Sequence, residues 1–295
     1  MKKLNISFNI EFDHLAISSR DPVATKYLGS YKSVFKGNGL EFEGYRKYSQ
    51  DDDASRIDWK ASRRVNQFMV REYTEERNLD VFFLIDVSNG MLLGAQPKLK
   101  CEYIAEVVSA LSRYILASGD NVGFALFNTN IVTFQLPRTG ETVHSELIHA
   151  LSNVGFYGGG SNVSSALSFA LKLISEGSLV ILLSDFINMP ASWSEFCALA
   201  GQKFSFIGML VRDPIDRELP EGKGQVALAD PYSNQTVLVD IASLKHAYAQ
   251  ENKAQEERLL YEFNVHGGDF VILQTNQSFI GPISRMFTER MERWR

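Results

Sequence analysis

Five consecutive apolar residues, 81–85, lead directly into Asp86 and are followed by Ser88. A second apolar run, 179–183, is followed two positions later by Asp185. Continuous apolar runs of this length are typical of strands that are buried on both faces of a parallel sheet. In such sheets ligands bind in the crevice at the carboxyl ends of the strands. We therefore expect the two strands to be parallel neighbours near the sheet centre, with both carboxylates at the same edge.

Strand and helix patterns alternate along the rest of the chain. Helical periodicity predicts helices over residues 98–117, 141–153, 162–175, 193–200, 251–263 and 283–294. Further strands are predicted over 121–127, 131–136, 204–211 and 270–274. This alternation predicts an α/β fold, with a doubly wound, mostly parallel central sheet that is covered by helices on both faces.

Two regions fall outside the alternation. Residues 214–240 contain two short alternating runs, 225–229 and 236–240, among prolines and glycines, and they predict a late hairpin insertion. Residues 1–78 form an N-terminal extension that becomes densely charged. Because residues 37–78 are too few and too charged to bury a core of their own, we expect them to pack on the main domain, residues 79–295.

Composition limits the classes of function. The net charge of −5 and the pI of about 5.6 give no support to nucleic-acid binding. The two cysteines, Cys101 and Cys197, lie far apart in helical patterns, which favours reduced thiols over a disulfide framework. The sequence shows neither the continuous apolar stretch of a signal peptide nor one long enough to span a membrane. We expect a cytoplasmic protein without membrane insertion.

Common catalytic motifs are absent from the sequence. It contains no Gly-x-x-x-x-Gly-Lys-[Ser/Thr] phosphate-binding loop and no Gly-x-Ser-x-Gly nucleophile turn. His-Glu-x-x-His and Cys-x-x-Cys are also missing, which argues against a zinc site. These absences favour a binding protein over an enzyme.

A glycine-rich loop adds a third group to the two carboxylates. Gly158, Gly159 and Gly160 precede Ser161, which we expect to be the N-cap of the following helix. Hydroxyl and carboxylate oxygens are ligands suited to Mg²⁺. The order Asp-x-Ser, loop hydroxyl, strand-end Asp resembles the metal-ion-dependent adhesion site of von Willebrand factor A domains, and the resemblance implies that Asp86, Ser88, Ser161 and Asp185 hold Mg²⁺. The chain departs from that motif at Gly90, where a second Ser is expected, so the metal is expected to bind weakly or not at all.

The segment upstream of the first apolar run carries a second resemblance. It contains Gly37-Asn38-Gly39-Leu40-Glu41-Phe42, later Ile57-Asp58-Trp59-Lys60, and then Val70-Arg71-Glu72. These motifs resemble domain-of-unknown-function family fifty-eight, in which they precede a von Willebrand A-like domain. The resemblance covers roughly residues 37 to 290. It implies an adaptor or chaperone-like protein that couples a MoxR-type AAA+ ATPase to a client protein.

The charged extension also supplies the residues expected to bind a partner. They are Arg56, Asp58, Trp59 and Lys60, because aromatic and Arg side chains contribute most of the binding energy at interfaces. Two alternatives stay open at this point. One is a metal-dependent hydrolase acting in the Asp86/Asp185 crevice, which would need a nucleophile or general base that the motifs do not supply. The other is a metal-free scaffold in which Gly90 marks a decayed site.

Overall fold

The computed structural model describes residues 40–49, 53–75, 78–94, 98–190, 192–219, 225–229 and 236–293. The chain divides into two compact units, with Phe35–Leu79 as one and the residues from Asp80 onward forming the body of the other. This boundary falls one residue beyond the predicted boundary between residues 78 and 79. The expected packing of the extension on the main domain stays a prediction, and the two units are described separately below.

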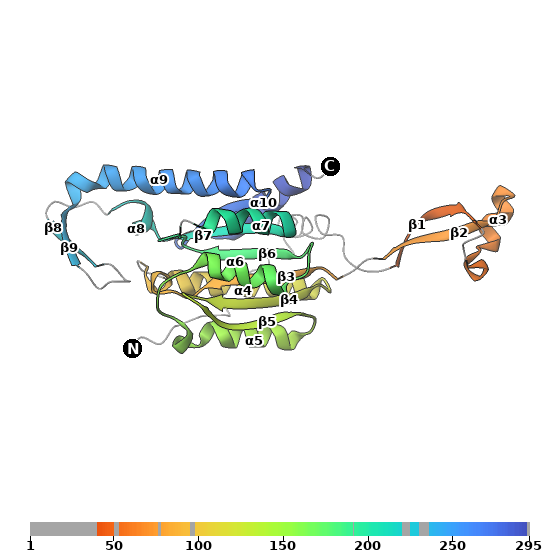
Figure 1. The fold of residues 1–295 in the computed structure, drawn as a ribbon, viewed down its shortest axis with the longest axis horizontal. Coiled ribbons are helices and arrows are strands. Elements are labelled where there is room, and N and C mark those ends of the chain that lie inside the picture. The colour runs from red at the N-terminus through yellow and green to blue at the C-terminus, as the bar shows by residue number, and fades with distance from the viewer. Residues whose placement is uncertain are drawn as a thin grey trace. The chain divides into compact units, whose positions relative to one another are not determined.

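The larger unit is built on a six-stranded sheet in the order β10-β7-β6-β3-β4-β5 (Figure 1). Its strands are β3 (Asp80–Asp86), β4 (Asn121–Phe127), β5 (Ile131–Arg138), β6 (Leu179–Ser184), β7 (Ser205–Arg212) and β10 (Asp269–Gln274). All neighbouring pairs are parallel except β4–β5, which is antiparallel. The predicted α/β class with a doubly wound, mostly parallel sheet is therefore confirmed.

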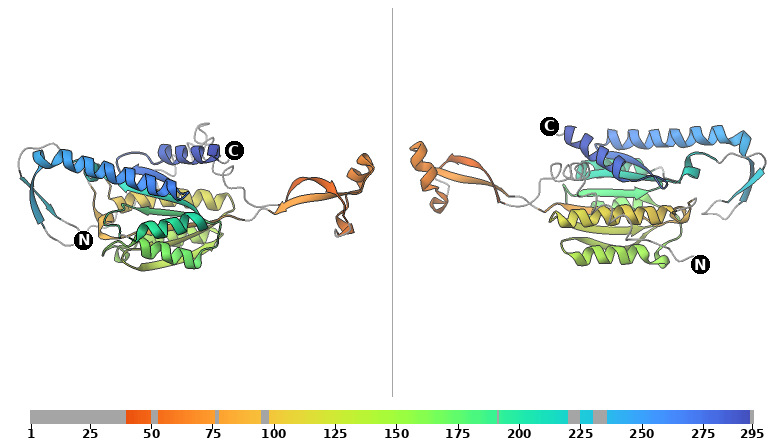
Figure 2. Two further views of the ribbon diagram at one scale, coloured as in Figure 1. Left: turned by 45° about the horizontal axis from the view of Figure 1, so that its top comes forward. Right: turned by 180° about the vertical axis from the view of Figure 1, so that it is seen from behind.

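Helices cover both faces of the sheet. Its helices are α4 (Lys100–Ala117), α5 (Glu141–Ser152), α6 (Val163–Leu173), α7 (Trp193–Lys203), α9 (Ile241–Val265) and α10 (Ile280–Arg293). One core joins α6, α7 and α9 to alternate residues of the central strands, such as Phe82 and Leu84. The opposite face carries α4 and α10 (Figure 2, right). Because successive side chains of β3 point to opposite faces of the sheet, β3 contributes apolar side chains to the helix packing on both faces. All of Val81–Ile85 is buried.

The core beneath α9 centres on Phe263. Its ring stacks on Phe206 with centroids 5.0 Å apart and also contacts Phe186 and Phe270. Gly208 of β7 makes room for this ring, because a Cβ at that position would lie 2.3 Å from the Phe263 Cζ atom. The close approach of ring and strand explains why a glycine lies in the middle of a buried strand.

The predicted hairpin forms with the expected bounds, β8 (Gln225–Ala229) paired antiparallel with β9 (Thr236–Asp240). The helix that follows differs from expectation, since α9 begins at Ile241 and not at residue 251. Asp240 caps it by accepting a hydrogen bond from the backbone N–H of Ala242. The first ten residues of α9 are mostly exposed, so they carry little of the apolar periodicity on which the prediction depended.

Both cysteines of the chain are free and buried, Cys101 in α4 and Cys197 in α7. Burial, with Glu102 near Cys101 and Glu262 near Cys197, raises the pKa of each thiol to about 12. In the described part of the chain, no helix combines the length and the apolar character needed to cross a membrane.

The smaller unit contains an antiparallel pair, β1 (Leu40–Lys47) and β2 (Met69–Glu75), with helix α3 (Trp59–Val65) between them. Asp58 caps α3, because its Oδ1 atom accepts hydrogen bonds from the N–H groups of Lys60 and Ala61. Ser62 ties α3 to β2, since its hydroxyl donates to the Asp58 carbonyl and accepts from the Met69 N–H. The motif Ile57-Asp58-Trp59-Lys60 is therefore a helix start, which periodicity did not predict.

Candidate functional site

The crevice at the carboxyl ends of β3 and β6 is the point where the strand order reverses. β3 is the first strand of the sheet in the chain, the chain then builds β4 and β5 on one side of it, and β6 returns to its other side. Open α/β sheets bind ligands at this kind of switch point. Asp86 is the last residue of β3 and Asp185 directly follows β6; the two strands are parallel neighbours, as predicted, and both side chains are buried.

Asp86 is held by three donors from three segments. Its Oδ1 atom accepts a hydrogen bond from the N–H of Ser88 at 2.8 Å. Its Oδ2 atom accepts from the hydroxyls of Ser161 at 2.7 Å and Ser184 at 2.6 Å. The structure thus brings the predicted residues Asp86 and Ser161 together, and it adds Ser184, which sequence reasoning missed. The only sequence signal for Ser184 was its place at the end of the second apolar run.

The glycine-rich loop places Ser161 by binding the end of β3. The N–H of Gly158 donates to the Val87 carbonyl, and the Gly159 carbonyl accepts from the N–H of Asn89. Gly158 and Gly159 have φ values of 137° and 78°, a backbone conformation that favours glycine. The N-cap prediction for Ser161 is wrong, because Asn162 caps α6 through the N–H of Ser165. The Ser161 hydroxyl is therefore available to Asp86.

Ser88 and Ser109 are the two serines of the described residues whose buried hydroxyl lacks a hydrogen-bond partner, and Ser88 is the one close in sequence to Asp86. Its side chain is fully buried, and its hydroxyl oxygen has no hydrogen-bond partner. Leaving a buried hydroxyl without a partner costs roughly 1–3 kcal/mol. An unsatisfied donor and acceptor beside a buried carboxylate is the arrangement expected where an unseen ligand completes the site.

The charge of Asp86 is only partly compensated. Burial, and next the negative charge of Asp185, raise the pKa of Asp86 to about 6, although the hydrogen bonds from Ser184, Ser161 and Ser88 lower it. A buried carboxylate in this condition is stabilised by a proton or a cation. The electrostatics of the crevice therefore favour binding of positive charge.

Lys100 supplies one positive charge close to this crevice. Its Nζ atom lies 2.9 Å from Asp185 Oδ2 and 3.0 Å from Asp216 Oδ2. The side chains of Lys100 and Asp185 are both fully buried. Burial alone lowers the pKa of Lys100, but the two carboxylates raise it by more, so it stands above the ordinary lysine value. Sequence reasoning missed Lys100 and Asp216, which are 116 positions apart.

The loop after β6 has a strained backbone. Phe186 and Asn188 have φ values of 50° and 54°, in the left-handed region that a bulky Phe rarely adopts. Three hydrogen bonds fix the loop. The N–H of Phe186 donates to Ser184 Oγ, the N–H of Ile187 donates to Asp185 Oδ1, and Gln255 Nε2 of α9 donates to the Phe186 carbonyl. Strain held by packing next to a crevice is a feature of functional sites.

The donor set fits a divalent cation in part. Among the described residues no three His, Cys, Asp or Glu side chains form a metal-binding group, so a cation would depend on hydroxyl oxygens. Ser161 donates its hydrogen to Asp86, which leaves its oxygen lone pairs available, and Ser88 has no partner. These two hydroxyls and the Asp86 carboxylate are hard donors of the kind Mg²⁺ prefers. Asp185 is already engaged by Lys100.

The predicted partner-binding residues lie in the smaller unit and differ in exposure. Trp59 is 65% exposed, Lys60 is exposed, and Asp58 is buried as the α3 cap. The backbone of Arg56 lies in the short 3-10 helix before α3, and its side chain is outside the described residues. A hollow of about 950 Å³ surrounds α3, lined by Trp59, Lys60, Ser62, Arg63, Arg64, Asn66, Gln67 and Phe68. Its charged lining residues are all basic.

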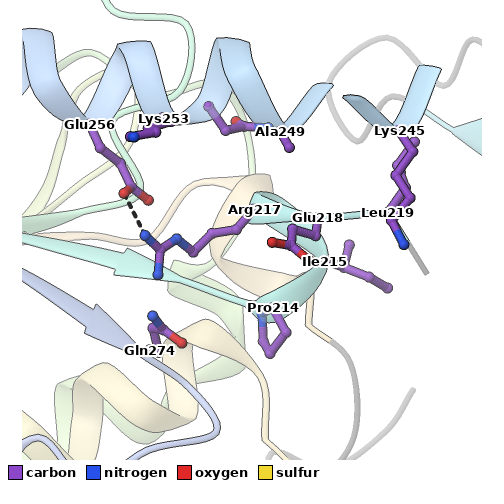
Figure 3. A pocket seen from close by; sticks show the side chains of 11 residues that line it. Pro214, Ile215, Arg217, Glu218, Leu219, Lys245, Ala249, Lys253, Glu256 and Gln274 are labelled. Atoms are coloured by element: carbon purple, nitrogen blue, oxygen red, sulfur yellow. Dashed lines mark hydrogen bonds and ion pairs between the residues drawn. The ribbon is translucent and has the colours of Figure 1, made fainter. Parts of the chain in front are cut away.

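A second hollow, of about 690 Å³, lies between α9 and the short helix α8 (Pro214–Arg217) (Figure 3). Arg217 of α8 crosses it to form an ion pair with Glu256 of α9, at 2.8 Å (Figure 3). Asp216, the neighbour of Arg217, is a partner of Lys100. The helix that borders this hollow is therefore connected to the crevice by the Lys100–Asp216 ion pair.

The sheet order and the helices on both faces define an α/β protein with a doubly wound, mostly parallel sheet, the class that the sequence predicted. The family model "Protein of unknown function DUF58" matches residues 44–258, and the chain belongs to this family. The uncharacterized protein Rv1480 of Mycobacterium tuberculosis is 22% identical over 265 residues, covering 89% of this chain and 83% of that protein.

Similar solved structures include the conserved hypothetical protein BatB from Bacteroides thetaiotaomicron. It is 19% identical, with a TM-score of 0.49 over 73% of this chain and 100% of that chain. Another is a von Willebrand factor type A protein from Catenulispora acidiphila. It is 13% identical, with a TM-score of 0.40 over 74% of this chain and 43% of that chain.

Proposed function

We propose that this chain is a non-enzymatic protein-binding adaptor that uses a degenerate metal-ion-dependent adhesion site. The observation that carries the proposal is the buried Ser88 hydroxyl without a partner, beside a carboxylate whose pKa is raised to about 6. Ser88, Ser161 and Asp86 would hold a weakly bound Mg²⁺, and water would fill the position that Gly90 leaves without a hydroxyl. When bound, the cation supplies a positive charge for an acidic side chain of a partner.

The partners we propose are a MoxR-type AAA+ ATPase and a client protein, as the resemblance to the family implies. The smaller unit supports a binding role through the exposed Trp59 and the exposed bases of α3, Lys60, Arg63 and Arg64. Exposed Trp and Arg side chains are common energetic centres of interfaces. Asp58 contributes indirectly by capping α3 and fixing its start.

Calorimetric titration of metal-free protein with Mg²⁺ or Mn²⁺ tests the cation site. We expect weak binding in the wild type and none in Asp86→Asn, which keeps the shape of the side chain but removes its charge. Equal binding by both proteins would refute the site. A turnover assay on phosphoesters with Mg²⁺ separates this proposal from a hydrolase, since measurable hydrolysis that Asp86→Asn abolishes would favour the enzyme.

Binding of the purified MoxR-type ATPase tests the partner surface. We expect Trp59→Ala to weaken binding about tenfold or more, as for truncation of an interface anchor. Leu199→Ala is the matched control, because Leu199 is an apolar side chain, 50% exposed, on α7 of the larger unit. Equal loss in both variants would argue against a role specific to α3.

One observation favours the metal-free scaffold as a second candidate. Asp185, which the adhesion motif assigns to the metal, already has a buried cationic partner in Lys100. The titration above decides between the two, because the scaffold predicts no divalent binding to the wild type.

A further inference from the structure

Lys100, the first residue of α4, is a basic residue in the interior of the larger unit, as is Arg212 of β7. The Lys100 side chain is fully buried, and its ammonium group contacts two carboxylates from two other segments. Buried lysines are rare, and one that is charged needs partners that replace its lost hydration. Asp185 and Asp216 provide such partners.

Each oxygen of Asp185 accepts one hydrogen bond, and one of the two donors is a cation. Oδ2 accepts from Lys100 Nζ at 2.9 Å, and Oδ1 accepts from the N–H of Ile187 at 3.2 Å. Asp86, by contrast, accepts hydrogen bonds from the Ser161 and Ser184 hydroxyls and the Ser88 N–H, and within the described residues none of these partners carries a positive charge. The two carboxylates of the crevice therefore differ in their counter-charges.

We infer that Lys100 is a positioning residue that supplies the positive charge for Asp185, so that a divalent cation in this crevice is held by Asp86, Ser88 and Ser161 without Asp185. The statement about the cation rests on the proposed function. The ion pair itself does not, since it is formed by side chains of the protein alone.

The same ammonium group fixes α8 relative to the crevice. Asp216 Oδ2 accepts from Lys100 Nζ and also from the N–H of Asp213, the cap of α8. Lys100 thus joins the loop after β6 to the start of the segment that leads to the β8–β9 hairpin. Loss of Lys100 would release both carboxylates at once.

The first test is a double-mutant cycle on Lys100 and Asp185, measured by thermal unfolding in the presence of a chelator. Removing Lys100 leaves two carboxylates without their cation, so Lys100→Met should lower Tm by about 10 °C. Asp185→Asn should lower Tm by less, because Lys100 retains Asp216 as a partner. The double variant should be more stable than Lys100→Met alone, because only Asp216 is then left without its cation. Additive losses would overturn the inference.

An exposed pair provides the matched control. Arg138 and Glu146 form an ion pair at 2.5 Å with side chains 45% and 47% exposed. Because exposed pairs contribute little, Arg138→Met and Glu146→Gln should each shift Tm slightly and additively. If Lys100→Met fails to fold, Asp185→Asn alone keeps the inference testable, since Lys100 retains Asp216 and the second test does not need the cycle.

The second test measures the increase in Tm on adding Mg²⁺ or Mn²⁺. Asp185→Asn should retain most of the increase seen in the wild type, and Asp86→Asn should lose it. Equal loss of the Tm increase in the two variants would show that Asp185 is a ligand of the cation and would overturn the inference. If the wild type shows no increase, the cation part of the proposed function fails, and the cycle in chelator still decides whether Lys100 is the partner that Asp185 requires.

Discussion

The Ser184 hydroxyl donates to the Asp86 carboxylate at 2.6 Å, across the two strands where the sheet order reverses. The same hydroxyl oxygen accepts the N–H of Phe186, the first residue of the strained loop. One serine therefore joins the buried acid of β3 to the loop that follows β6. Its replacement should affect the acid and the loop together.

Ser184→Ala should destabilise the protein by roughly 1–3 kcal/mol, because it leaves a buried N–H without a partner and removes a donor to Asp86. Denaturant unfolding measures the free energy of unfolding. Ser152→Ala is the control, since Ser152 is exposed and its hydroxyl donates only within α5, to the Ile148 carbonyl. A surface change of this kind should stay within about 0.5 kcal/mol.

Gly90→Ser should strengthen Mg²⁺ binding by up to about tenfold, which corresponds to ~1.4 kcal/mol. The added hydroxyl would replace a water in the coordination of the ion. Titration calorimetry on the variant and the wild type measures the difference. An unchanged affinity would show that residue 90 does not face the ion.

Gly208→Ala should cost roughly 1–3 kcal/mol through overpacking, because the new methyl group would collide with the Phe263 ring. Gly281→Ala is a matched control in α10, where a Cβ would meet nothing within 4 Å. Since alanine favours helices over glycine, this control should be neutral or stabilise by up to ~1 kcal/mol. Similar losses in both variants would rule out the ring contact as the cause.

Acidification should destabilise the protein through His144. Burial and the charge of Arg113 lower the pKa of His144 below its ordinary value. The unfolded chain then binds more protons than the folded one as the pH falls below about 6.5, so stability declines from there toward the lower folded pKa. Between pH 7 and pH 5 the free energy of unfolding of His144→Gln should decline less than that of the wild type. Parallel stability curves for the two proteins would contradict this assignment.

Apolar periodicity predicted most of the larger unit because its strands are buried on both faces and its helices carry one apolar face. β4 and the β8–β9 hairpin have the expected bounds, and the Asp86 and Asp185 strands are neighbours. The early part of α9 and the short helix α3 escaped prediction, since neither has an apolar stripe. Asp240, a capping residue directly before Ile241, was the signal available for α9.

The sequence predicted only those residues of the candidate site whose side-chain type alone indicates their chemistry. Asp86 and Ser161 were expected together, and the structure joins them. Lys100 was not expected, because a lysine at the start of an amphipathic helix indicates a solvated side chain. Its burial depends on Asp185 and Asp216, which only the tertiary fold brings to it.

The two buried thiols make the folded protein slow to react with alkylating reagents, because the thiolate is scarce and shielded at neutral pH. Each labelling event therefore reports a transient opening of the helix that carries the thiol. Cys101 directly follows Lys100, whereas Cys197 lies in α7 on the opposite side of the sheet. Mass spectrometry of singly labelled protein therefore measures the labelling rate of each cysteine separately. A ligand that stabilises the crevice should lower the labelling rate of Cys101 in α4 more than that of Cys197 in α7.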